Sequence, residues 1–271
     1  MTAATAFDAG ERRAWAGRAQ AYAASFAKLC AYPVPQLLDA AGVGAGVRVL
    51  DVGTGSGTVA AAAAERGATV TAVDAQPDMV ALTSRAVPAA DVQVAVLPRL
   101  PFADNDFDAV VGNFVLNHVG TPRAALIELA RVTRPGGTIA LTIWCAPAGA
   151  GAELLGRAVQ AAGAARPPYL PPFPPEEDFP RDEKGLTALV SAAGLSVIEC
   201  RTLTWDHRAT AEEWWSGPAS GVAYVGQVLA NSSTQTVEEI KDYFDRFSAE
   251  FLGSDGRLRL PHQALLVSAS V

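Results

Sequence analysis

Between residues 47 and 144, short apolar runs alternate with segments of helical character. Strands are predicted over the apolar and β-branched stretches 47–52, 68–75, 92–96, 107–115 and 137–144. Helices are predicted over 59–67, over 77–86 and from Thr121-Pro122 to about Val132. Near-continuous apolar strands that alternate with helices are typical of a mostly parallel sheet covered on both faces. The pattern therefore predicts an α/β fold for this part of the chain.

The segments on either side of this core have a different pattern. Residues 11–41 are Ala-rich and predicted to be helical, with Trp15, Tyr22 and Phe26 on one face. A further helix is predicted over 149–163. It is followed by a loop over 166–180 whose seven prolines exclude both a helix and a central strand. Loops of this length inside a compact domain are usually functional or mobile.

The C-terminal part combines helices with two predicted strands. A helix to about Ala193 precedes a strand over 196–205, and the chain closes with a strand over 264–271. Helices begin near Thr210 and Thr236, and each threonine is followed three residues later by a glutamate, as in a capping box. Without a repeat or a separating linker, residues 1–271 are predicted to form one domain. Its parts are an N-terminal helical cap (1–46), a cofactor-binding core (47–144), and a cap insertion with the last strands (145–271).

Composition limits the partners that we expect the protein to bind. Half of the residues are hydrophobic and the net charge is −7, so nucleic acid and anionic membranes are not expected as partners. Cys30, Cys145 and Cys200 lie far apart and form neither a disulfide framework nor a zinc motif. We find no signal peptide and no run of 18 apolar residues. The sequence therefore predicts a cytoplasmic protein whose partner is a small molecule, and it leaves the oligomeric state open.

The stretch that indicates chemistry is Val49-Leu50-Asp51-Val52-Gly53-Thr54-Gly55-Ser56-Gly57, followed by Asp74 at the end of the next strand. Glycines between a strand and a helix bring backbone amides close to a ligand, and a carboxylate such as Asp74 accepts hydrogen bonds from a ribose. Thr58 replaces the third glycine of a dinucleotide-binding motif. Asp51 would repel a pyrophosphate but suits the cationic groups of S-adenosylmethionine. The alternative is that these glycines form only a tight strand-to-helix turn and bind no ligand. Asp51 before the turn and Asp74 after it disfavour this alternative.

With these residues identified, the chain resembles the class I S-adenosylmethionine-dependent methyltransferases over nearly its whole length. Within them it is similar to the small-molecule branch related to ubiquinone and menaquinone biosynthesis. The similarity rests on residues 49–57, 70–80, 100–119 and 125–144, with weaker support from 14–22 and 255–270. It implies a Rossmann-like, seven-stranded, mostly parallel sheet with helices on both faces. N-terminal helices and a helical, proline-rich cap would be added to this sheet.

The resemblance also implies a set of contacts to S-adenosylmethionine. The methionine half would be lined by Gly53, Thr54, Gly55 and Gly57, with Asp51 nearby and the carbonyl of Asn113 at the amino group. Asp74 would hold the ribose, Ala75 and Met79 would flank the sugar and adenine, and Tyr22 would close over the cofactor. Many relatives carry an aspartate for the adenine amino group where this chain has Val96. Backbone groups of Leu97 or Pro98 are the expected substitutes.

Methyl transfer from a sulfonium depends mainly on positioning, and a general base helps when the acceptor is a hydroxyl. The chain has three histidines. His118 follows the fourth strand at the expected mouth of the site, where it acts either as a base or as a pocket-forming residue. His207 is a second candidate for the same mouth. His262 is predicted to be structural.

The acceptor pocket is expected in the variable parts of the chain. Its candidate residues are Trp144, Tyr169, Phe173, Trp205 and His207, whereas Trp214 and Trp215 are expected in the core. No metal is expected, because the acidic runs near residues 104–108 and 176–178 are typical of solvated turns. O-methylation of a small organic acceptor is favoured over C- or N-methylation. The alternatives are a cyclase that keeps the methyltransferase fold and a non-enzymatic cofactor-binding module.

Overall fold

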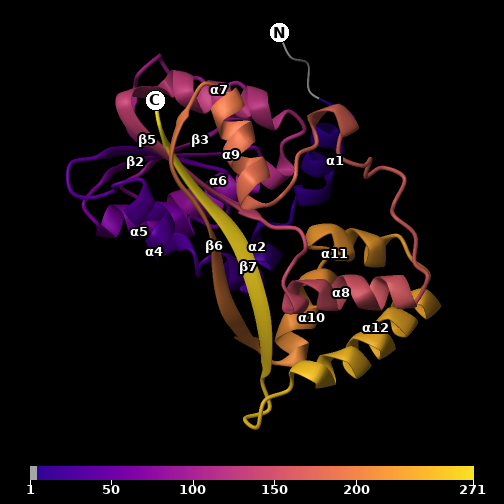
Figure 1. Cartoon of the computed structure of the whole chain (residues 1–271). Coiled ribbons are helices and arrows are strands. Elements are labelled where there is room, and N and C mark those ends of the chain that lie inside the picture. The colour runs from indigo at the N-terminus through magenta and orange to yellow at the C-terminus, as the bar shows by residue number, and fades with distance from the viewer. Residues whose placement is uncertain (1–4) are drawn as a thin grey trace.

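The computed structural model describes residues 5–271 and has a seven-stranded sheet at its centre (Figure 1). The strands are β1 (Arg48–Val52), β2 (Thr69–Asp74), β3 (Asp91–Val94), β4 (Phe107–Asn113), β5 (Thr133–Trp144), β6 (Ser196–Ala209) and β7 (Leu258–Ser270). Their spatial order is β3-β2-β1-β4-β5-β7-β6. β7 is antiparallel to both of its neighbours, and the other pairs are parallel. The predicted Rossmann-like, mostly parallel sheet is confirmed.

Helices cover both faces of this sheet. Those in the first two thirds of the chain are α1 (Ala6–Trp15), α2 (Ala19–Ala24), α3 (Ala27–Cys30), α4 (Val34–Ala40), α5 (Thr58–Glu65), α6 (Pro77–Ala86), α7 (Pro122–Val132) and α8 (Ala150–Ala161). They are followed by α9 (Glu183–Ala192), α10 (Ala211–Ala219), α11 (Ala223–Ala230) and α12 (Thr234–Ser248). α4 and α5 bury Leu37 and Ala60 against one face, while α7 and α9 bury Leu129 and Leu186 against the other.

The N-terminal segment is helical, as its pattern predicts, but it is not one continuous helix. It is divided into α1, α2, α3 and α4, because the chain turns at Gly17 with a φ of +73°, leaves the helical conformation at Ser25 and turns again before Pro33. A positive φ favours glycine and ends a right-handed helix. Trp15, Tyr22 and Phe26 therefore belong to different elements. The three side chains nevertheless all face the same cavity.

A helical cap stands beside the far half of the β6–β7 pair, which extends beyond the other strands (Figure 1). α8, α10, α11 and α12 bury Leu154, Trp214, Val228 and Phe244 in a core of their own. α11 lies in the uncharged region before residue 237, where no helix was predicted. Residues 166–180 contain only a short 3-10 turn (Pro175–Glu177), as the prolines predict.

One of the two predicted capping boxes is confirmed and the other is wrong. At α10, the hydroxyl of Thr210 accepts from the N–H of Glu213, and the Glu213 carboxylate accepts from the N–H of Thr210. α12 begins two residues earlier than predicted, because the hydroxyl of Ser233 caps it by accepting from the N–H of Thr236. The Ser233 cap places Thr236 inside the first turn.

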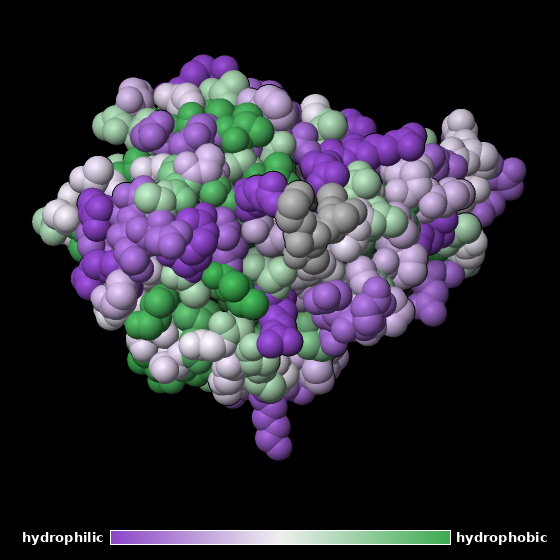
Figure 2. Space-filling view, turned by 90° about the horizontal axis from the view of Figure 1, so that it is seen from above, coloured by the Kyte–Doolittle hydropathy of each residue, from purple (hydrophilic) through white to green (hydrophobic). Residues whose placement is uncertain are grey.

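Viewed from above, hydrophilic and hydrophobic residues are interspersed over the surface (Figure 2). Within residues 5–271, no helix combines the length and the apolar character required to cross a bilayer.

Candidate active site

The glycine-rich turn after β1 needs its glycines for two reasons. Gly53 and Gly55 have φ angles of +71° and +57°, which L-residues with a side chain rarely adopt. A Cβ atom on Gly53 would also lie 2.5 Å from Cγ2 of Val115. The turn therefore presents backbone rather than side chains to the space above the sheet.

Asp51 is buried beneath this turn. Its Oδ2 accepts a hydrogen bond of 2.7 Å from the hydroxyl of Thr54, whereas its Oδ1 has no partner. Burial raises the pKa of this carboxyl from 3.8 to about 7, against the opposing effect of the Thr54 hydrogen bond. A nearby cation would shift the balance back toward the ionised form.

Asp74, the last residue of β2, links the turn to the next loop. Its Oδ2 accepts from the N–H of Gly55 at 2.9 Å, and its Oδ1 accepts from the N–H of Gln76 at 2.9 Å. Burial raises the pKa of Asp74, and these two backbone bonds oppose the rise. The carboxylate and the glycine turn thus form one hydrogen-bonded unit.

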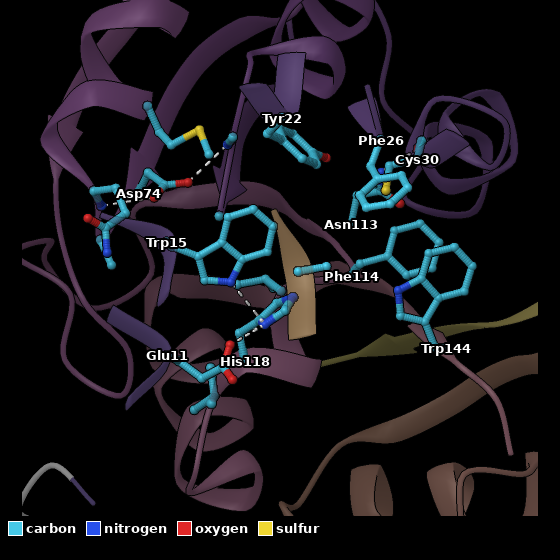
Figure 3. Close-up of a pocket in the computed structure, with 18 of the residues that line it drawn as sticks. Glu11, Trp15, Tyr22, Phe26, Cys30, Asp74, Asn113, Phe114, His118 and Trp144 are labelled. Carbon is cyan, nitrogen blue, oxygen red and sulfur yellow. Dashed lines mark hydrogen bonds and ion pairs between the residues drawn. The ribbon is translucent and has the colours of Figure 1, made fainter. Parts of the chain in front are cut away.

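A cavity of about 420 Å³ extends from this unit across the carboxyl ends of the strands (Figure 3). Ten of the predicted site residues line it: Tyr22, Gly53, Gly55, Asp74, Ala75, Met79, Leu97, Asn113, His118 and Trp144. Eight others lie outside its lining, namely the cofactor candidates Asp51, Thr54, Gly57 and Pro98 and the acceptor candidates Tyr169, Phe173, Trp205 and His207. The hydroxyl of Thr54 holds Asp51, and Gly57 packs closely against Thr83.

His118 lies at the polar end of the cavity and is held by the N-terminal helix. Its Nδ1 is 2.7 Å from Oε2 of Glu11 and 3.4 Å from the indole nitrogen of Trp15 (Figure 3). The shorter contact is the stronger one, so Nδ1 carries the hydrogen and donates it to the carboxylate. The other ring nitrogen, Nε2, then remains free to accept a proton.

The opposite end of the cavity is an aromatic chamber, which we define by Phe26, Phe114, Trp144, Trp214 and His262. The rings of Phe114 and Trp144 stack with centroids 3.9 Å apart, and Phe26 meets Trp214 edge-on at 5.1 Å. Figure 3 shows Asp74 and Glu11 on one side of the cavity and Trp144 on the other. The charged residues that line the cavity, Asp8, Glu11, Arg12 and Asp74, come from α1 and β2.

Several acceptor candidates lie elsewhere. His207 and Trp205 pack behind the chamber and do not line it, so His207 does not reach the mouth as expected. The hydroxyl of Tyr169 donates to Gln227 at 2.8 Å. Phe173 lines a neighbouring cavity of about 280 Å³, which shares Glu11, Trp15 and His118 with the first.

Two late aromatic residues line the cavity although neither was predicted as a site residue. His262, predicted to be structural, is one of the residues that line the chamber. Trp214 is buried as expected of a core residue, but it lines the chamber as well. Trp215 packs on Phe244 in the cap core, as predicted.

Sequence reasoning also missed Glu11 as the partner of His118. The two residues are 107 positions apart, and no local pattern connects them. Across residues 5–271, His, Cys, Asp and Glu side chains nowhere gather in a group of three that could hold a metal ion.

Comparison with known proteins matches residues 50–141 to a family described as "Methyltransferase domain". An uncharacterised protein of Mycobacterium tuberculosis (strain H37Rv) is 35% identical over 61% of this chain and 62% of its own length. The demethylmenaquinone methyltransferase of Beutenbergia cavernae is 37% identical over 62% of this chain and 73% of its own length. The chain spans less than two thirds of the mycobacterial relative.

Solved structures show the same fold at low sequence identity. BH2331 from Bacillus halodurans C-125 has a TM-score of 0.58 and 19% identity, covering 88% of this chain and 97% of its own. The [4+2]-cyclase SpnF has a TM-score of 0.53 and 16% identity, covering 89% of this chain and 80% of its own. A shared fold therefore accompanies different reactions.

Proposed function

The chain belongs to the class I S-adenosylmethionine-dependent methyltransferases, and from that premise we propose that it methylates an oxygen atom of a small organic acceptor. The observation that carries this proposal is a single cavity with two unlike ends. One end combines a carboxylate with a glycine turn, and the other is an uncharged aromatic chamber. This arrangement suits a cofactor and an acceptor side by side.

The polar end fits S-adenosylmethionine, the cofactor of this family. Each oxygen of Asp74 accepts one backbone hydrogen bond and keeps a lone pair for a ribose hydroxyl. The unpartnered Oδ1 of buried Asp51 would be stabilised by a cationic amino or sulfonium group. A pyrophosphate would be repelled by the same carboxylate, which disfavours a nicotinamide dinucleotide.

When bound, S-adenosylmethionine supplies an electrophilic methyl group. The protein's own contribution is to hold the acceptor oxygen in line in a space from which water is excluded. The stacked rings of Phe114 and Trp144 are suited to this role, because they offer flat apolar surfaces to an aromatic acceptor. His118 would take the hydroxyl proton at Nε2, with Glu11 holding Nδ1–H in place.

The acceptor we favour is a neutral aromatic molecule related to quinones. Support comes from the uncharged chamber and from relatives named demethylmenaquinone methyltransferase. A reducing cytoplasm suits the three free cysteines of the chain.

The first test is isothermal titration of the protein with S-adenosylmethionine, S-adenosylhomocysteine and NAD. We expect saturable binding of both adenosyl ligands and none of NAD. Incubation of S-adenosylmethionine with a panel of phenols and hydroquinones, analysed by mass spectrometry, should then yield O-methylated products. Binding without any methylated product would favour the cyclase or the binding module. Absence of adenosyl binding by folded protein would refute the cofactor assignment.

A further inference from the structure

Among residues 5–271, the far wall of the aromatic chamber holds an unusual group of unpaired polar atoms. Four ring nitrogens there are shielded from solvent and have no hydrogen-bond partner: Trp205 Nε1, His207 Nδ1, Trp214 Nε1 and His262 Nε2. Their rings form one cluster, with Trp214 and His262 5.4 Å apart between centroids and Trp205 and His262 6.1 Å apart. Buried polar groups are nearly always paired, so this concentration calls for an explanation.

Only two of the four residues adjoin the cavity. Trp214 and His262 both line it, although each residue has only 3% of its surface exposed. Trp205 and His207 pack behind them. A ligand in the chamber therefore has Trp214 and His262 as its nearest unpaired polar side chains on that wall.

The hydrogen-bonding role of His262 is determined by its neighbour. Its Nδ1 lies 2.8 Å from the carbonyl oxygen of Leu260, which can only accept, so Nδ1 carries the hydrogen. Nε2 then carries no hydrogen and can only accept a hydrogen bond. Burial lowers the pKa of His262 to about 4, so the ring is neutral near pH 7. The indole nitrogen of Trp214 can only donate.

One acceptor and one donor on neighbouring rings match a hydroxyl group, which both donates and accepts. We propose that His262 and Trp214 recognise a hydroxyl of a neutral aromatic acceptor other than the one that faces His118, and that this hydroxyl donates to Nε2 of His262 and accepts from Nε1–H of Trp214. The proposal deepens the proposed function and rests on the chamber being the acceptor site. Both nitrogens are shielded from solvent, so the proposal requires side chains of the chamber to shift when the acceptor binds.

This proposal gives the two histidines of the cavity different roles. His118 sits at the polar end on a carboxylate and is suited to proton transfer, whereas His262 lies among aromatic rings and is bonded to a backbone carbonyl. His262 is therefore a specificity-determining residue that positions the acceptor. Its loss should raise the KM for a hydroxylated acceptor more than it lowers kcat.

The test uses 2-naphthol and 2-fluoronaphthalene, which have nearly the same shape and differ in the hydroxyl. Titration into protein saturated with S-adenosylhomocysteine should show about tenfold tighter binding of 2-naphthol, as expected for one good hydrogen bond. His262→Phe should abolish this preference and leave the affinity for 2-fluoronaphthalene within twofold. His262→Gln, which restores an acceptor, should recover part of it, and Trp214→Phe should reduce it.

His207→Phe is the matched control, because it alters a buried histidine of the same cluster that does not line the cavity. This variant should keep the preference for 2-naphthol. The proposal is overturned if wild-type protein binds neither probe or shows no preference. It is also overturned if the preference survives in both His262→Phe and Trp214→Phe. A retained preference in protein that transfers no methyl group would instead count against the proposed function alone.

Discussion

The two ends of the cavity are built in opposite ways. At the polar end, Asp74, Gly55 and Gln76 are joined by backbone hydrogen bonds, and the residues come from neighbouring parts of one strand–helix–strand unit. At the aromatic end, Phe26, Trp144 and His262 come from segments more than a hundred residues apart. Two ring nitrogens there, Nε2 of His262 and Nε1 of Trp214, have no hydrogen-bond partner.

This difference indicates which part of the site serves which ligand. A carboxylate held by two backbone hydrogen bonds and a glycine turn form a rigid template, which suits one cofactor bound in one way. Unpaired donors and acceptors on packed rings discriminate between ligands, because a molecule without matching groups leaves them unsatisfied. The polar end is therefore expected to govern cofactor affinity, and the aromatic end to govern the choice of acceptor.

The largest expected effect is on the rate of methyl transfer rather than on ligand binding. His118→Ala removes the proposed base, so kcat should fall by about 10²–10⁴-fold while the affinity for S-adenosylhomocysteine changes little. Glu11→Gln should cause a smaller loss, because an amide oxygen still accepts from Nδ1–H. Steady-state kinetics and titration of each variant measure the two effects. If His118→Ala weakens cofactor binding as much as turnover, His118 is a pocket-forming residue.

Asp74→Ala tests the polar end. The variant loses the proposed ribose contacts together with the bonds from Gly55 and Gln76, so cofactor binding should weaken by about 1.5–3 kcal/mol. Calorimetry with S-adenosylhomocysteine measures this loss. Asp91→Ala, an exposed aspartate on the adjacent strand, is the control and should bind normally. An unchanged affinity in folded Asp74→Ala protein would remove Asp74 from the cofactor site.

Because the carboxyl of Asp51 is buried, we expect the affinity for S-adenosylmethionine to depend on pH. Because burial raises its pKa to about 7, Asp51 is protonated below that pH, and a cationic ligand must displace the proton. Affinity for S-adenosylmethionine should therefore rise between pH 5 and 7, by at most about tenfold per pH unit, and level off above. Asp51→Asn should flatten this profile in calorimetric titrations. A slope that persists in the variant would assign the dependence to another group.

The smallest expected effect concerns the helix that carries Trp214 into the chamber. Thr210→Ala removes the cap of α10 and should lower the free energy of unfolding by about 1 kcal/mol, and Ser233→Ala should do the same at α12. Thr236→Ala should have almost no effect, since Ser233 is the cap. Urea denaturation of the three variants checks the order. Equal losses of unfolding free energy in Thr210→Ala and Thr236→Ala would instead indicate that Thr236 caps α12, as the sequence predicts.

Much of the fold could be predicted because its signals are local. Apolar strands, a proline at the start of α6 and α7, and glycines at the turns lie within a few residues of the elements they define. The helical character of residues 11–41 was predicted, but the break at Gly17 was not, because the pattern of apolar residues does not reveal its left-handed conformation. α11 was missed because its uncharged residues show little contrast between a buried and an exposed face.

The amino-acid sequence by itself determined the part of the polar end made by the glycine turn and Asp74, because these residues lie in one strand–helix–strand unit whose geometry follows from backbone conformation. Only the tertiary structure decided the rest. It brought Glu11 to His118 across 107 residues and placed His262 rather than His207 on the chamber wall. These contacts depend on how the cap packs on the β6–β7 pair. Packing of distant segments is set by the sum of many weak contacts, and no single motif records it.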